Sequence, residues 1–398
     1  MDRLMSFMGV IVFIGMCYLL SENRKNIKWR TVAWGFLLQL LFAILILKTA
    51  AGNVIFDAVR GAFEYVTMFS DKGASFLFGK LVSDFDISAI VAFKVLPIII
   101  FVSALMGILY YLGIIQFFVV IGARIMQRTM KISGAESLGA TLLVFMGIEA
   151  TTALKTYILK MTRSELFVVM SAFMATIATS VMATYVSFGA DAGHLLAASI
   201  MSAPASVLIA KILVPETKVP ETAGYVSFKH EKTETNIVEA AANGASLGMN
   251  LALHIGAMLI AFIALIWLFN SIFGIFKTSF DEVMSYVYFP FAVLMGIPPE
   301  EALTAGKLLG IRTVFNEFIA YLQLKDLIQS GALSPRTIVI MTYALCGFAN
   351  IGSMGILIGG IGSIAPERKA EVSSLGIKSI IAGTIACFIT ACIAGILF

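Results

Sequence analysis

The sequence has little charge. Asp, Glu, Lys and Arg make up only 13% of its 398 residues, whereas a soluble globular protein carries roughly 25%. Hydrophobic residues account for 59%, and the mean hydropathy is +0.95. These values exclude an ordinary soluble domain and indicate an all-α polytopic membrane protein in a lipid bilayer. The net charge of +4 is too small to suggest a nucleic-acid surface, so we expect no nucleic-acid partner.

Signatures of metal binding and catalysis are also scarce. The four cysteines (Cys17, Cys346, Cys387 and Cys392) lie in apolar runs without CxxC spacing, and the three histidines form no cluster. These cysteines therefore resemble small packing residues. The sequence has no Walker A, Rossmann, Ser/His/Asp or HExxH pattern. We expect neither ATP-driven transport by this chain alone nor an organic cofactor.

Apolar runs long enough to cross a bilayer, which takes roughly 20 residues, recur along the chain. The eight predicted spans are 5–20, 33–47, 87–115, 165–188, 195–213, 236–276, 337–361 and 372–398. Segments that mix apolar and charged residues are predicted to be interfacial amphipathic helices, and they are 51–85, 116–131 and 278–296. The loop after the first span is basic, with Arg24, Lys25, Lys28 and Arg30. The positive-inside rule places this loop in the cytoplasm and the N-terminus outside.

Two further apolar segments, 132–160 and 298–322, are interrupted near their centres by polar residues. Each half is only about ten residues long, too short to span, so both segments are predicted to be re-entrant helical hairpins. Two helices follow each hairpin, and the count of spans places the hairpins on opposite sides. This is an inverted-topology repeat, typical of secondary transporters.

The repeat divides the chain into four parts. We expect a scaffold at 1–131, the first transport repeat at 132–213, a second scaffold and trimerisation part at 214–297, and the second transport repeat at 298–398.

A carboxylate lies at the break of each hairpin, Glu149 in the first and Glu317 in the second. An ionisable group at membrane depth costs roughly 2.5–3.5 kcal/mol even on lenient scales, so it usually marks a substrate or ion path. The alternative is a buried core carboxylate with a local partner. Arg312, five residues before Glu317, is expected either to pair with a carboxylate or to snorkel to the interface, and we favour pairing.

Unwound backbone within a bilayer is tolerated only where it is buried in protein or lines a cavity. The polar residues at four predicted breaks are therefore candidates for one site: Gly147, Glu149, Thr176, Thr179, Asn316, Glu317, Asn350 and Ser353. Carboxylates, amides and hydroxyls suit a sugar or polyol together with a coupling cation, not an anionic substrate. For Asn350 and Ser353, helix–helix hydrogen bonding is the alternative.

Two motifs carry a family resemblance. Residues 316–321 (NEFIAY) resemble the NEFVAY element of the concentrative nucleoside transporters, and residues 346–356 (CGFANIGSMGI) resemble that family's CGFANFSSIGI element. Residues 333–336 and 366–369 also match in place. The resemblance covers nearly the whole chain. It implies a homotrimer in a bacterial inner membrane that imports nucleosides with a cation gradient, by an elevator-like motion of the hairpin-containing domain.

The resemblance also implies roles for individual residues. Glu317 would bind ribose hydroxyls, with three polar residues beside it: Asn316, Asn350 and Ser353. Phe348 would flank the sugar, and Glu149 would face the nucleobase from a hairpin tip that also contains Gly147 and Ile148. A sodium ion would be held by the carbonyls of Phe145 and Ile177 and by the Thr176 hydroxyl.

The first hairpin departs from the family pattern. Its tip typically reads Gly-Gln-Thr/Ser-Glu, but here it reads Met146-Gly147-Ile148-Glu149, without the amide and hydroxyl that would contact a nucleobase. Leu142 stands where a polar side chain could serve sodium. We therefore expect sugar recognition to be intact and base recognition to be altered. Coupling to either protons or sodium remains open, as does another nucleoside-containing or sugar-like solute.

Two other functional classes compete with transport driven by an ion gradient. A membrane-embedded enzyme could use the two glutamates as acid and base, but the chain offers little polar loop beyond 214–235, and we expect no enzyme. A channel or scaffold would show no saturable, gradient-driven uptake.

Overall fold

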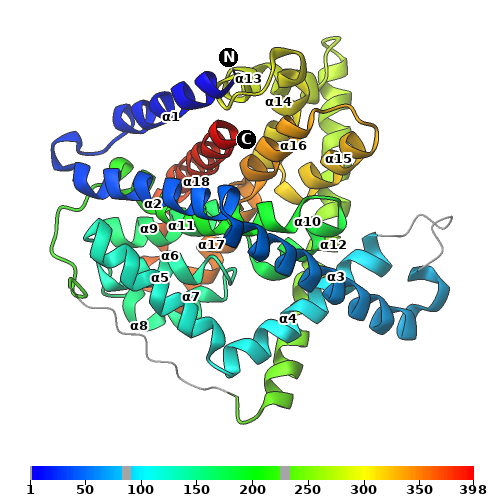
Figure 1. Cartoon of the computed structure of the whole chain (residues 1–398), viewed down its shortest axis with the longest axis horizontal. Helices are drawn as coiled ribbons and strands as arrows, with labels where there is room; N and C mark the ends of the chain where they lie inside the picture. The colour runs from blue at the N-terminus through cyan, green and yellow to red at the C-terminus, as the bar shows by residue number, and fades with distance from the viewer. Residues whose placement is uncertain (1, 83–90, 225–233) are drawn as a thin grey trace.

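The computed structural model describes residues 2–82, 91–224 and 234–398, whose regular secondary structure is entirely helical (Figure 1). The α-helices are α1 (Asp2–Leu19), α2 (Trp29–Lys48), α3 (Ala50–Phe78), α4 (Leu96–Tyr111), α5 (Ile114–Met130), α6 (Gly134–Leu142), α7 (Ala150–Ala153), α8 (Lys155–Ile158), α9 (Arg163–Ala175), α10 (Thr179–Ser187), α11 (Ala192–Leu213), α12 (Ile237–Gly274), α13 (Phe280–Leu294), α14 (Pro299–Val314), α15 (Glu317–Gln329), α16 (Pro335–Leu345), α17 (Ile351–Ile364) and α18 (Lys369–Leu397). Short helical turns are η1 (Arg24–Asn26), η2 (Gly79–Val82), η4 (Val91–Val95) and η5 (Pro366–Arg368).

Seven of the described helical segments are long and apolar enough to cross a membrane. They are Asp2–Leu19, Trp29–Lys48, Val91–Tyr111, Arg163–Ser187, Ala192–Leu213, Ile237–Gly274 and Pro366–Leu397. The remaining predicted span, 337–361, is present as α16 and α17, two shorter helices on either side of a break. The start of the predicted span 87–115 lies outside the described residues. The predicted all-α membrane fold is therefore confirmed.

Both predicted hairpins are present as helices on either side of a break. The first consists of α6 followed by the short helices α7 and α8, and the second consists of α14 followed by α15. The amphipathic segments form α3, α5 and α13, of which α3 is one continuous helix of 29 residues.

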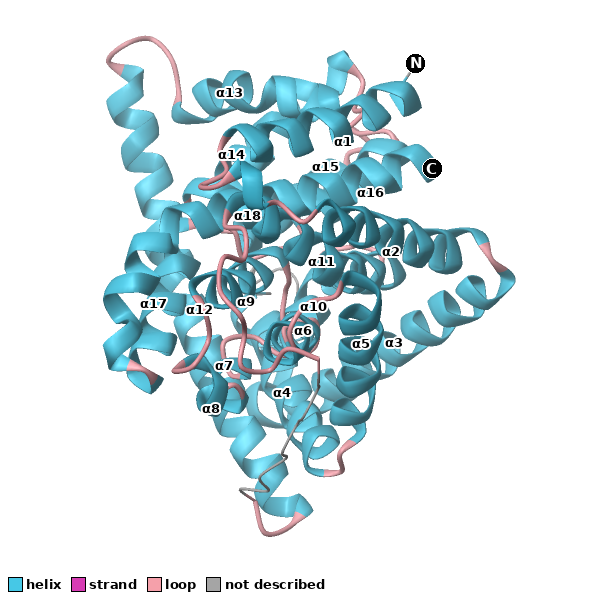
Figure 2. Cartoon of the chain, turned by 90° about the vertical axis from the view of Figure 1, so that its left-hand side faces the viewer, coloured by secondary structure: helices cyan, strands magenta, loops and turns pink. Residues whose placement is uncertain are grey.

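Burial separates an inner group of helices from an outer pair. In the spans formed by α9 with α10 and by α11, 89% of the most apolar window is buried, and in α18 the share is 83%. In α12 it is only 17%, and α12 packs chiefly along α4 (Figure 2). The chain ends meet beside the inner group, where Arg3 donates to the main-chain oxygen of Phe398 at 2.9 Å.

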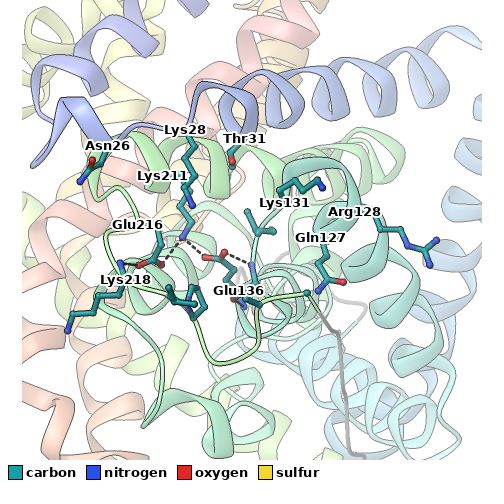
Figure 3. A pocket seen from close by; sticks show the side chains of 16 residues that line it. Asn26, Lys28, Thr31, Gln127, Arg128, Lys131, Glu136, Lys211, Glu216 and Lys218 are labelled. Atoms are coloured by element: carbon teal, nitrogen blue, oxygen red, sulfur yellow. Dashed lines mark hydrogen bonds and ion pairs between the residues drawn. The ribbon is translucent and has the colours of Figure 1, made fainter.

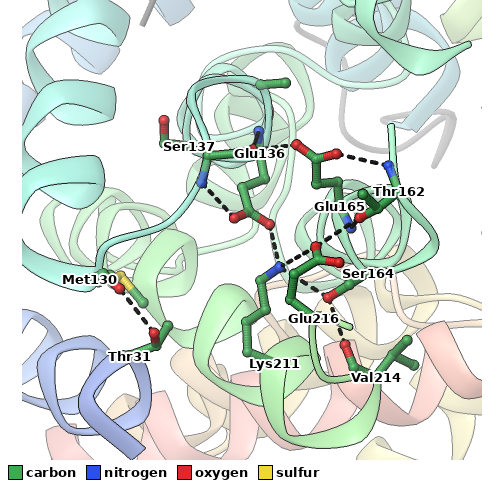
Figure 4. A network of polar contacts seen from close by, with 12 residues as sticks. Thr31, Met130, Glu136, Ser137, Thr162, Ser164, Glu165, Lys211, Val214 and Glu216 are labelled. Atoms are coloured by element: carbon green, nitrogen blue, oxygen red, sulfur yellow. Dashed lines mark hydrogen bonds and ion pairs between the residues drawn. The ribbon is translucent and has the colours of Figure 1, made fainter. Parts of the chain in front are cut away.

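A buried polar network fixes the two ends of the first hairpin (Figure 4). Lys211, near the end of α11, lies 2.6 Å from a Glu136 carboxylate oxygen and donates to the Ser164 hydroxyl at 2.9 Å. Glu136 lies in the first turn of α6, and Ser164 lies in the first turn of α9. Glu165 accepts a 2.5 Å hydrogen bond from Ser133, the N-cap of α6. One lysine therefore joins the helix that enters the hairpin to the helix that follows it.

The segment after α11 covers this network. Glu216 accepts a hydrogen bond from the Thr162 hydroxyl at 2.7 Å. The Thr222 carbonyl accepts from the Gly134 N–H at 2.9 Å, and the Thr222 hydroxyl accepts from the Ala135 N–H at 3.0 Å. A cavity of about 470 Å³ opens beside it, with Glu136 and Glu216 in its lining (Figure 3). The break residues are not part of that lining. The cavity therefore belongs to the root of the hairpin, not to its tip.

Candidate functional site

The two broken helices meet at their breaks. The Phe348 N–H, between α16 and α17, donates to the Thr176 carbonyl, between α9 and α10, at 3.3 Å. Gly347 permits this approach, because a Cβ built there would lie 2.8 Å from the Met174 carbonyl oxygen. The Phe348 ring packs against Phe173 with centroids 5.5 Å apart. The break between α9 and α10 therefore lies directly against the break between α16 and α17.

The tip of the first hairpin lies against the same break. The Phe145 carbonyl accepts a hydrogen bond from the Thr179 hydroxyl at 3.0 Å. Glu149 is half-buried, and its carboxylate lies over Gly147, where a built Cβ would be 2.9 Å from Oε2. Ile148 packs against α17, because a Cβ built at Gly360 would lie 2.6 Å from its Cγ1. The isoleucine at the tip thus fills a helix–hairpin contact.

The Glu317 carboxylate is buried and accepts a hydrogen bond on each of its two oxygens. Glu317 is the first residue of α15 and is only 5% exposed. Asn316 caps that helix by accepting from the Ile319 N–H at 2.9 Å. The Asn350 amide donates to Glu317 Oε2 at 2.8 Å. Since a helix N-terminus favours negative charge, this position suits a carboxylate.

Asn350 has a second task, which fixes its orientation. It is the N-cap of α17, and its Oδ1 accepts from the Ser353 N–H at 2.7 Å. The amide nitrogen is therefore left to face Glu317. Asn316 and Asn350 are buried N-caps of α15 and α17, and Ser353, also buried, lies in the first turn of α17. Two helix N-termini thus converge on one carboxylate.

Tyr185 is a site residue that the sequence interpretation missed. It lies in α10, is fully buried, and donates its hydroxyl to Glu317 Oε1 at 2.8 Å. Its signal in the sequence was weak, because it is one tyrosine in a long apolar run. Glu317, from the second repeat, is thereby held by a side chain of the first repeat.

The oxygens considered for a cation lie in the same region. Ile177 is fully buried at the break, and the Thr176 hydroxyl donates to the Ala172 carbonyl at 2.8 Å. Leu142, the last residue of α6, is fully buried and has no side-chain oxygen to offer. Among the described residues, no group of three or more His, Cys, Asp or Glu side chains could hold a metal ion. A cation here would depend on carbonyl and hydroxyl oxygens, which suit hard ions.

The expected pairing of Arg312 with a carboxylate is corrected by the structure. Arg312 is fully buried, and its guanidinium donates to the Cys387 sulfur at 3.2 Å. Burial in the second hairpin prevents snorkelling, and the side chain reaches α18 instead. All four cysteines are free and buried, as expected of packing residues.

Family models match almost the whole chain. They are the Na⁺-dependent nucleoside transporter N-terminus at residues 8–81, a nucleoside recognition model at 92–192, and the Na⁺-dependent nucleoside transporter C-terminus at 194–395. The chain belongs to the sodium-dependent nucleoside transporter family. The resemblance found in the two sequence motifs is therefore confirmed, and the family is one of transporters, not of enzymes.

Relatives of the transporter are found in bacteria and vertebrates. Solute carrier family 28 member 3 of Eptatretus stoutii is 42% identical over all of this chain and 61% of its own length. An uncharacterised transporter of Haemophilus influenzae is 41% identical over all of this chain and 98% of its own length. The transporter thus spans about three-fifths of the length of the vertebrate relatives that it matches.

Solved structures of CNTnw share the fold of the transporter. An inward-facing, substrate-bound state matches with a TM-score of 0.94 at 38% identity, covering 100% of this chain and 98% of that chain. An outward-facing state of a variant matches with a TM-score of 0.95 at 38% identity, covering 100% and 99%. The fold therefore occurs in proteins that have been captured facing either side.

Proposed function

We propose that this transporter imports nucleosides by symport with a cation, either a proton or sodium. The observation that carries the proposal is the Glu317 carboxylate, which is buried at the crossing of the broken helices and held by Tyr185 and Asn350. A buried acceptor with fixed orientation suits the hydroxyls of ribose. Family membership supports the substrate class. The alternative substrate is another nucleoside-containing or sugar-like solute, favoured by Gly147 and Ile148 at the altered hairpin tip.

The proposal assigns a part to each half of the site. Glu317, Asn350 and Ser353 bind the sugar, with Asn316 and Phe348 beside it. Glu149, with Gly147 and Ile148, faces the base. A coupling sodium, where sodium is used, is held near Phe145, Thr176 and Ile177. The short distances between these segments across the breaks support this arrangement.

Alternating access is proposed to follow an elevator-like motion. The parts at 132–213 and 298–398 carry the substrate, and those at 1–131 and 214–297 provide the scaffold. The apolar surface exposed along α12 supports its contact with lipid or with other subunits of a homotrimer. We place the protein in a bacterial inner membrane with its N-terminus outside, because the basic loop around Lys25 favours the cytoplasm.

Uptake into proteoliposomes tests this function. Radiolabelled uridine and adenosine are offered under separate sodium and proton gradients, and saturable uptake under one of them is expected. Glu317→Gln should abolish uptake, whereas Glu367→Gln, at an exposed glutamate, should leave it unchanged. If neither gradient drives uptake of any nucleoside, the proposed substrate class is wrong. If Glu317→Gln transports normally, the assignment of the sugar site is wrong.

A further inference from the structure

The Tyr185 ring cannot turn freely. It stacks on Tyr321 with centroids 4.2 Å apart and planes 16° apart, and Phe318 meets it edge-on at 5.9 Å. Tyr321 is itself fixed, because its hydroxyl donates to the Thr342 carbonyl at 2.6 Å. The hydroxyl of Tyr185 can therefore leave Glu317 only when the helix that carries it, α10, moves relative to α15.

The other end of α10 is fixed to the first hairpin. Thr179, its first residue, donates both its hydroxyl and its N–H to the Phe145 carbonyl, at 3.0 and 3.4 Å. Tyr185 lies six positions after Thr179, a rise of about 9 Å along a helix. The three residues before α10 form the unwound break that contains Thr176 and Ile177. One short helix therefore joins the hairpin tip and this break to the carboxylate of the second repeat.

We propose that Tyr185 is a positioning residue through which the first hairpin and the break before α10 control how Glu317 presents its oxygens to the substrate. This inference rests on the proposed nucleoside function and deepens it. A change at the break, such as binding of the coupling cation, shifts α10 and with it the Tyr185 hydroxyl. Substrate affinity and cation binding are coupled by this rigid connection, with no direct contact between the two ligands.

The hydrogen bonds of Glu317 explain why this position matters. Oε1 accepts from Tyr185 and Oε2 accepts from Asn350. Each carboxylate oxygen has two lone pairs, so each can still accept one hydrogen bond from a hydroxyl of the substrate. With both protein donors in place, the plane of the carboxylate is fixed and only certain hydroxyl geometries fit. Without the Tyr185 hydroxyl, one of the two hydrogen bonds that hold the carboxylate plane is lost, and selectivity for the sugar should weaken.

The test compares Tyr185→Phe with Tyr343→Phe in the full chain. Both variants keep the aromatic ring and remove a fully buried hydroxyl, but the Tyr343 hydroxyl contacts His194 at 3.2 Å, not Glu317. Uptake of uridine, 2′-deoxyuridine and 3′-deoxyuridine is measured across a range of the driving cation. A hydrogen bond to a charged group typically changes an equilibrium constant about ten- to a hundred-fold. We expect the KM of Tyr185→Phe for uridine to rise by that factor.

Two further readouts separate positioning from a general structural effect. In Tyr185→Phe, the preference for uridine over its deoxy analogues should shrink, and the cation should no longer lower KM as it does in wild type. Thr179→Val, which removes the hydroxyl at the other end of α10, should also weaken the effect of the cation on KM. The double variant should lose little more of this effect than the stronger single variant, because both act on one connection.

The inference is overturned if Tyr185→Phe keeps the wild-type analogue preference and cation dependence. It is also overturned if Tyr343→Phe changes both to the same extent. Failure of the proposed function looks different, because wild type itself would then take up no nucleoside under either gradient.

Discussion

Lys211 should be the most sensitive charged position at the root of the first hairpin. The Lys211 side chain is 7% exposed, and its ammonium lies 2.6 Å from a Glu136 carboxylate oxygen and 3.5 Å from one of Glu216. These carboxylates are 2% and 7% exposed, and Glu165 adds a third carboxylate to the network. Lys211→Met keeps the apolar stem but leaves the carboxylates without their cation. The variant therefore removes the charge and the hydrogen bonds of the ammonium while it keeps the packing of the stem.

The expected magnitude follows from this burial. Removing one partner of a buried ion pair typically costs about 3–5 kcal/mol, because the remaining charge is uncompensated. The Ser164 hydroxyl also loses a donor, since Lys211 bonds it at 2.9 Å. We expect Lys211→Met to lower stability by about 3–5 kcal/mol, which corresponds to a fall of roughly 4–6 °C in Tm for a chain of this size.

Thermal unfolding of the purified protein in detergent measures this loss. Lys218→Met is the matched control, because Lys218 is exposed in the segment that follows α11 and should change Tm little. The double variant Lys211→Met with Glu136→Gln should recover part of the loss, since it removes one uncompensated carboxylate. A Tm for Lys211→Met within 1–2 °C of wild type, with no recovery in the double variant, would refute the reasoning about the network.

Three further predictions concern contacts between distant parts of the chain. Gly193→Ala should destabilise the protein by about 1–3 kcal/mol, because a Cβ at Gly193 would overlap the Phe56 ring. Phe56→Ala should restore the stability of this variant. An unchanged Tm for Gly193→Ala would mean that the ring moves aside freely. Burial alone would raise the pKa of the Glu22 carboxyl, but hydrogen bonds from basic side chains on α9 and α18 outweigh it and hold the pKa below the usual 4.5. Glu22→Gln should therefore lower the free energy of unfolding at pH 7 by less than about 1 kcal/mol. The difference in this free energy between the variant and wild type should fade as the pH drops below 4.5. A difference that stays constant with pH would contradict this. Arg60→Ala should lower the free energy of unfolding by less than about 1 kcal/mol, and by less still in high salt, because the Arg60 and Asp191 side chains of its ion pair are 52% and 26% exposed. A loss of stability that is insensitive to salt would show a different role for the pair.

Local patterns in the sequence were sufficient to predict the helices and to nominate candidates for the site. Apolar runs gave the spans, and short halves around a polar break gave the hairpins. Asn316 and Asn350 were singled out because each lies at a predicted break and within a motif that resembles the family. Each proved to be an N-cap beside Glu317, so local and long-range roles coincide there.

Contacts that depend on packing between distant helices could not be predicted in this way. The bond from Tyr185 to Glu317 joins positions 132 residues apart, and nothing near Tyr185 in the sequence indicates it. Lys211, one lysine at the end of an apolar helix, gave no sign of its partner in the first hairpin. Arg312 was predicted to pair with a carboxylate, yet its guanidinium donates to the Cys387 sulfur. Each outcome was set by which helix faces meet.

The two glutamates differ in how firmly the protein holds them, and this difference bears on substrate choice. Glu317 is buried, with one donor on each oxygen and helix N-termini beside it. Glu149 is half-buried over Gly147, and its neighbour Ile148 is packed against α17. A rigid acceptor rejects ligands that lack its hydrogen-bond partner, whereas an apolar neighbour cannot strongly reject a ligand that merely adds a polar group. Selectivity should therefore be strict for the sugar and broad for the base.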